Sequence, residues 1–123
     1  MVVAEVAGPR GLCLRCFMCL DTGADHCIFP LSFATEIGLN PQTMPSHLTA
    51  GCGSSANVTY YGPVQIEIIG GGRETPNISF ETFAGFTAGM DAQGIGLLGG
   101  TGFFERHVVT LDHPGRRFSI QVL

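Results

Sequence analysis

The stretch from Cys16 to Ala24 reads CFMCLDTGA, an apolar run that ends at an acid, a small hydroxyl residue and a glycine. The apolar run predicts a strand, and the acid marks the point where that strand turns. At such a turn the Thr22 hydroxyl can satisfy nearby backbone groups, and Gly23 permits a backbone conformation that other residues resist. Asp-Thr-Gly is also an ordinary turn sequence, so the rest of the chain must decide whether this turn is a site.

The length and composition of the chain predict a single mostly-β domain. The 123 residues fit one domain, and an apolar content of 45% with 13% charged residues excludes disorder. The 18 glycines and 7 prolines favour short strands joined by tight turns over a helix bundle. We therefore expect residues 1–123 to form one domain.

Apolar and alternating runs predict where the strands lie. They cover Val2–Val6, Leu12–Leu20, His47–Ala50, Val58–Tyr61, Val64–Ile68, Ile78–Glu81, Val108–Leu111 and Phe118–Val122, with a short apolar run at Gly96–Gly99. A helix is expected over Pro30–Ile37, between a proline suited to a first turn and the stop signal Gly38. A second, brief helix is expected over Gly102–Arg106.

Charge and cysteine usage limit the partners of the chain. The net charge is −4 and the six basic residues are scattered, which argues against nucleic acid. No apolar run approaches the roughly 20 residues that span a bilayer, and the N-terminus lacks the basic region of a signal peptide. The five cysteines are an odd number, so at least one thiol stays unpaired within a monomer. We expect a cytoplasmic protein with reduced cysteines and no membrane partner.

Two motifs together resemble those of the retropepsin-like aspartic proteases, the single-domain relatives of pepsin. Residues 21–24 look like the catalytic turn of that family, and Asp25 follows as in retroviral members. Residues 97–99, Leu-Leu-Gly, with Phe103-Phe104 after them, are similar to the second signature, which packs behind the catalytic loop. Residues 28–39 are similar to the segment after the catalytic turn in bacterial members. Both signatures in this order are more specific than either alone.

The resemblance implies a closed β-barrel of the acid protease fold, with one or two short helices and a flap. The glycine hairpin over residues 49–56 is placed like that flap, which would close over the substrate and exclude bulk water. The implied site comprises Asp21, Thr22 and Gly23 as catalytic residues and Ala24, Asp25, Gly51, Cys52, Gly53 and Ser54 as substrate-binding residues. No cofactor or metal is implied. One departure concerns Gly100, which stands where retroviral members often carry Arg, so Asp25 lacks that partner.

The chemistry of the turn predicts a homodimer. Metal-free hydrolysis of a peptide bond needs one group to take a proton from water and another to give one to the carbonyl oxygen. Two carboxylates about 3 Å apart can do both, because they share one proton. The chain holds a single Asp-Thr-Gly, and Asp91-Ala92-Gln93-Gly94 lacks the hydroxyl and the spacing. A second copy must therefore supply the second carboxylate across a two-fold axis, as the resemblance also implies.

Other functions stay open on the sequence. A catalytically inactive peptide-binding or dimerisation module with the same fold is one alternative. The spacing Cys13-x-x-Cys16-x-x-Cys19 suggests a metal domain, but on a strand a spacing of three sends Cys13 and Cys16 to opposite faces. Residues 94–99 fit GxGxxG, but they lack the long following helix of a dinucleotide fold. The four histidines are expected at the surface or in turns.

Overall fold

The computed structural model describes residues 1–50, 56–71, 76–112, 114–115 and 117–123, without the side chains at 49, 50, 56 and 57. Strands form 54% of the protein and helices 11%, which confirms the mostly-β prediction. In chain order the elements are β1 (Val2–Ala7), β2 (Cys13–Leu20), β3 (Ile28–Pro30), α1 (Leu31–Glu36), η1 (Pro41–Thr43), β4 (Ser46–Ala50), β5 (Ala56–Ile68), β6 (Ile78–Thr87), η2 (Ala88–Met90), β7 (Gly96–Leu98), β8 (His107–Asp112) and β9 (Arg117–Val122).

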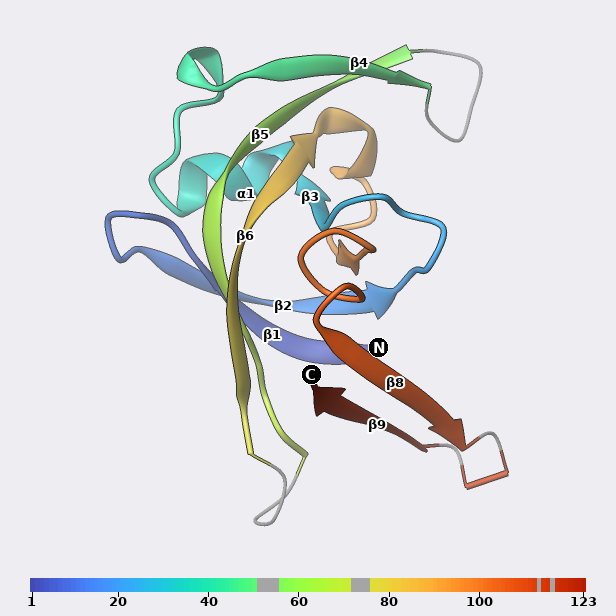
Figure 1. The fold of residues 1–123 in the computed structure, drawn as a ribbon. Coiled ribbons are helices and arrows are strands. Elements are labelled where there is room, and N and C mark those ends of the chain that lie inside the picture. The colour runs from blue at the N-terminus through green and yellow to red at the C-terminus, as the bar shows by residue number, and fades with distance from the viewer. Residues whose placement is uncertain (51–55, 72–75, 113, 116) are drawn as a thin grey trace.

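Six strands close into a barrel, as expected. Their order is β1-β2-β7-β3-β6-β5, and β1 closes the ring because it pairs with β5 as well as with β2 (Figure 1). Alternate residues of β1 and β5 point inward, so the paired residues Val6 and Ile66 are fully buried while Gln65, next to Ile66 in β5, is exposed. β4 extends from β5 beyond the ring, and β8 and β9 form a separate two-stranded sheet.

The helix after β3 follows from its boundary residues. Pro30 precedes the first turn of α1 with φ −55°, an angle that its ring favours, and the prediction of a helix over Pro30–Ile37 is confirmed within a residue at each end. Gly38 ends the helix with φ +83°, which a residue with a Cβ adopts only under strain. Among the residues that the structure describes, no helix is long and apolar enough to cross a membrane.

Two predicted boundaries are wrong for local reasons. The expected strands Val58–Tyr61 and Val64–Ile68 are one continuous strand, β5, because Pro63 pairs with Phe83 at a position where the ladder needs no N–H from the proline. The expected helix over Gly102–Arg106 is a series of turns. Gly102 has φ +99°, and the N–H groups of Phe104 and Glu105 donate to carbonyls five residues back instead of four.

Candidate active site

The turn that carries Asp21 begins where β2 leaves the barrel wall. β2 runs parallel to β7, and the ladder ends with the Asp21 N–H, which donates to the Leu98 carbonyl at 3.0 Å. Asp21 Oδ1 accepts the Gly23 N–H at 2.9 Å, and the Asp21 carbonyl accepts the Ala24 N–H at 3.2 Å. Asp21 is half-buried, while Thr22 and Gly23 are exposed. The turn thus fixes its own carboxylate and leaves part of it open to a ligand.

The glycine signature, which we define as residues 97–100, supports this turn from behind. After the turn the chain returns through β3 on the other side of β7, so β7 lies between β2 and β3. The Gly100 N–H donates to the Ala24 carbonyl at 2.8 Å, and the Thr101 N–H donates to the Asp25 carbonyl at 2.7 Å. The two motifs, about 77 residues apart in the sequence, are therefore held together by backbone hydrogen bonds.

Gly99 has no room for a side chain. A Cβ at this position would overlap the carbonyl group of His26 and lie 2.7 Å from the Ala24 carbonyl oxygen. Both contacts are to backbone atoms, which cannot rotate away as a side chain can. The close approach of the two loops therefore depends on glycine at position 99.

The two other acids of interest lie in different surroundings. Asp25 is exposed, and its carboxylate has no hydrogen-bond or ion-pair partner among the described residues. Asp91 accepts the Ser32 N–H at the start of α1 through Oδ1 at 3.2 Å. Asp91 thus binds the first turn of α1. It is not part of the turn over residues 21–24, which we call the acid turn.

The hairpin expected as a flap is present in its two strands. β4 and β5 pair antiparallel from Ser46 opposite Tyr60 to Ala50 opposite Ala56. The predicted substrate-binding residues at its tip, Gly51, Cys52, Gly53 and Ser54, lie outside the described residues. The described part of the candidate site therefore consists of the acid turn, the glycine signature and the base of the hairpin.

A cluster of aromatic rings, which the sequence did not predict, joins the hairpin to the loop that follows Asp21. The Tyr61 ring from β5 lies edge-on to His26, with centroids 5.3 Å apart, and to His47 of β4 at 5.9 Å. Tyr61 lies against Gly85 of β6, where a Cβ would come within 3.2 Å of the tyrosine ring. The four histidines do not all lie at the surface, since His107 is 4% exposed and donates from Nδ1 to the Phe103 carbonyl at 2.8 Å.

The cysteines of β2 point to opposite faces, as their spacing predicts. Cys13 is exposed and Cys16 is buried. Within the described ranges no group of three His, Cys, Asp or Glu side chains is arranged to hold a metal ion. Burial raises the pKa of the Cys16 thiol to about 11. Burial also raises the pKa of Cys27, an effect that a hydrogen bond from the Gly99 backbone opposes and the charge of Glu105 reinforces.

The buried thiols should make the protein less stable at alkaline pH. Because the folded Cys16 thiol has a pKa of about 11 against an ordinary value of 9.0, the unfolded chain loses this proton first. The contribution of Cys16 to the free energy of unfolding should therefore be constant below about pH 8 and fall by up to about 3 kcal/mol as the pH rises towards 11. Urea denaturation between pH 7 and 11 measures the loss. Cys16→Ala should reduce the pH dependence and Cys13→Ala should not; equal profiles for all three proteins would contradict this assignment.

No family model, no curated protein and no solved structure matches this chain. The class that the geometry defines is a closed six-stranded barrel with an acid turn packed on a glycine signature.

Proposed function

We propose that this chain is a retropepsin-like aspartic endopeptidase that acts as a homodimer. The observation that carries the proposal is the Asp21 turn, half-buried and hydrogen-bonded to the glycine signature through Leu98 and Gly100. This arrangement holds one carboxyl group rigidly at an open position on the barrel, which is what acid–base catalysis of peptide hydrolysis needs. The closed barrel and the hairpin of β4 and β5 support the same proposal.

In the proposed mechanism Asp21 faces its own copy across a two-fold axis. The two carboxyl groups share one proton, so they titrate as a coupled pair. The charged member takes a proton from a water molecule, which attacks the peptide carbonyl carbon, while the other gives its proton to the carbonyl oxygen. The water is the nucleophile, so no acyl-enzyme forms. Ala24 and Asp25, which follow the turn, would contact the substrate backbone.

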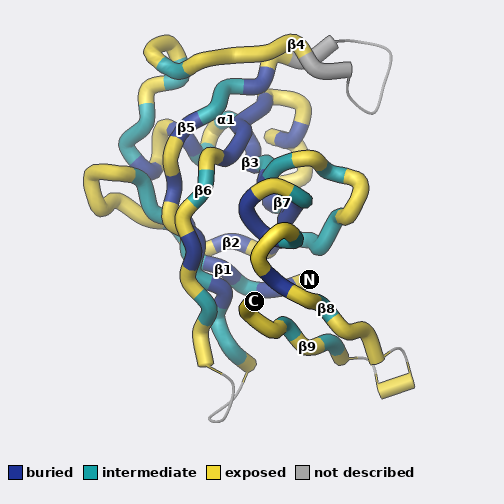
Figure 2. The backbone as a smooth tube through the Cα atoms, in the orientation of Figure 1, coloured by how far each residue is buried: buried dark blue, intermediate teal, exposed yellow. Residues whose placement is uncertain are grey.

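The β8–β9 hairpin, called here the C-terminal hairpin, offers a surface for the second copy. Its inward face carries Val109, Phe118 and Ile120, which pack partly on the core. On this same face Leu111 is 73% exposed and Val122 is 59% exposed. Figure 2 shows that much of β8 and β9 is exposed. Figure 1 places this hairpin, the loop after β2 and the end of β4 on one side of the barrel. A copy docked on that side would cover the apolar residues and bring the two acid turns together.

Leu111→Asp should weaken the dimer at least about tenfold, because the interface would have to bury a charged carboxylate. Val108→Asp is the matched control, since Val108 is also exposed but lies on the opposite face of the C-terminal hairpin. Sedimentation equilibrium measures the dissociation constant of each protein. Equal weakening by both substitutions, or by neither, would place the interface elsewhere.

Subunit mixing tests the shared dyad directly. When the parent chain is mixed with an equal amount of Asp21→Asn chain and the subunits exchange, about a quarter of the dimers carry two Asp21 residues. Hydrolysis of β-casein should then fall to about half of the value expected from the parent chains alone. Activity that simply follows the amount of parent chain would show that each chain works by itself, and absence of any hydrolysis by the parent would favour an inactive peptide-binding module.

A further inference from the structure

One side of β6 is paired along only part of its length. β3 covers the C-terminal end, from Gly85 to Thr87, and the Gly85 N–H donates to the Cys27 carbonyl at 2.8 Å. In a strand the backbone groups of every second residue point to the same side, so those of Glu81 and Phe83 point the same way as Gly85. We call residues 79–83 the β6 edge, because no described strand pairs with them on this side.

On the β6 edge the carbonyls have side-chain partners, whereas the N–H groups do not. The Phe83 carbonyl accepts a hydrogen bond from Thr82 Oγ1 at 3.4 Å. The Glu81 carbonyl accepts a hydrogen bond from Arg106 Nη1 at 3.2 Å, which confirms the direction in which this residue points. No described residue accepts the N–H of Glu81 or Phe83. An edge with free N–H donors is a template for another strand, and proteins usually block such an edge when it has no use.

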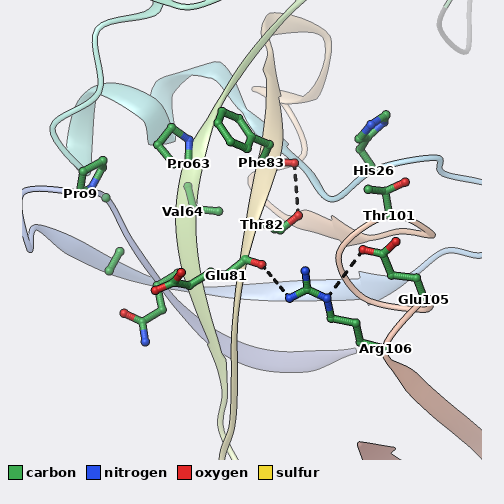
Figure 3. A pocket seen from close by; sticks show the side chains of 13 residues that line it. Pro9, His26, Pro63, Val64, Glu81, Thr82, Phe83, Thr101, Glu105 and Arg106 are labelled. Carbon is green, nitrogen blue, oxygen red and sulfur yellow. Dashed lines mark hydrogen bonds and ion pairs between the residues drawn. The ribbon is translucent and has the colours of Figure 1, made fainter. Parts of the chain in front are cut away.

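A hollow of about 740 Å³ lies beside this edge. Figure 3 shows Thr82 and Phe83 at its centre, Pro63 on one side, and His26, Thr101 and Arg106 on the other. Phe83 is 60% exposed and pairs with Pro63 across the sheet, which gives the hollow an apolar patch next to the free N–H groups. An extended peptide fits this combination, since its backbone can bond to the edge while an apolar side chain rests on the patch.

The hollow continues to the catalytic loop. His26 and Thr101 line its end, and the Thr101 N–H donates to the carbonyl of Asp25, four residues after Asp21. A polypeptide that extends from the scissile bond past this loop would reach the β6 edge without leaving the surface. The five residues of the edge span about 17 Å, which is enough for a short strand.

We infer that the β6 edge is an exosite that binds an extended segment of the substrate, away from the bond that is cut. As an exosite it rests on the proposed proteolysis, whereas the binding of extended polypeptide does not. The segment adds as a strand through the N–H groups of Glu81 and Phe83, and it places an apolar side chain on Phe83 and Pro63. Backbone pairing makes the site tolerant of sequence.

Binding of fluorescein-labelled β-casein, an unfolded polypeptide, to Asp21→Asn protein tests this inference, and fluorescence anisotropy gives the dissociation constant. Adding Phe83→Ser removes the apolar patch, and adding Glu81→Pro removes an edge donor that the β5–β6 ladder does not use. Each should weaken binding at least about fivefold with circular dichroism unchanged. Phe17→Ser is the matched control because Phe17 is 56% exposed on β2, away from the hollow, and it should change binding less than twofold.

Three results would overturn the exosite: no binding of β-casein, unchanged binding in both edge variants, or equal weakening by Phe17→Ser. If Glu81→Pro unfolds the protein, the result with Phe83→Ser alone decides whether the exosite stands. Cleavage of β-casein by the parent protein is measured separately. If the parent protein cleaves β-casein and the edge variants bind it as tightly as the parent, only the exosite is rejected. If binding depends on Phe83 but the parent does not cleave β-casein, only the proteolysis is rejected.

Discussion

Asp21→Asn should lower peptide hydrolysis at least about 1000-fold and leave the protein folded and dimeric. An amide can neither take the proton of the attacking water nor share a proton with its twin, so both acid–base roles are lost. The fold should be preserved, because the asparagine carbonyl can still accept the Gly23 N–H that Asp21 Oδ1 accepts at 2.9 Å. Release of amines from β-casein measures the rate, and sedimentation with circular dichroism measures the assembly and the fold.

Asp91→Asn is the control for this substitution. Asp91 is exposed, and its Oδ1 accepts the Ser32 N–H, a bond that an asparagine carbonyl can keep. The Asp91 variant should hydrolyse β-casein at the parent rate. Equal activity in the parent and Asp21→Asn proteins would remove Asp21 from the chemistry, and the acid turn would then be a structural turn only.

Gly99→Ala should destabilise the protein by about 3 kcal/mol or more and displace the loop that carries Asp21. The new methyl group would overlap the His26 carbonyl and press on the Ala24 carbonyl oxygen, 2.7 Å away. Relief requires the acid turn to separate from the glycine signature, so the hydrogen bonds from Gly100 and Thr101 would be strained or broken. Urea unfolding measures the stability, and amide hydrogen exchange of residues 21–26 measures the loop.

The neighbouring glycine gives a sharp comparison. A Cβ on Gly100 would lie 3.5 Å from the Asp25 carbonyl oxygen and 3.7 Å from that of Ala24, which are ordinary contacts. Gly100→Ala should therefore change the free energy of unfolding by less than about 1 kcal/mol. Similar losses of stability in the two variants would mean that the loops are not packed as described, whatever the protein does.

Local sequence patterns predicted the features that depend on neighbouring residues. The alternation of apolar residues located most strands, and Pro30 and Gly38 located the ends of α1, because those residues restrict or extend the backbone angles themselves. The spacing of Cys13 and Cys16 on a strand placed one thiol outside and one inside. The acid turn and the glycine signature were found as separate motifs, and the structure places them in contact.

Features that depend on distant parts of the chain were not predicted. The continuity of β5 through Pro63 depends on the pairing of Pro63 with Phe83. The turns over 102–106 depend on hydrogen bonds to the carbonyls of Gly99 and Gly100, five residues back in the sequence. The approach of His26 and His47 to Tyr61 follows from the crossing of three separate segments. No local sequence pattern predicts these long-range contacts, since they arise from the closure of the barrel.

The position of β7 between β2 and β3 imposes an order on biosynthesis. The Leu98 carbonyl accepts the N–H of Asp21. Leu98 leaves the ribosome 77 residues after that aspartate. Closing so large a loop is entropically costly, and among the described strands β7 alone lies between β2 and β3. A nascent polypeptide therefore carries an unassembled acid turn until translation has passed the second motif.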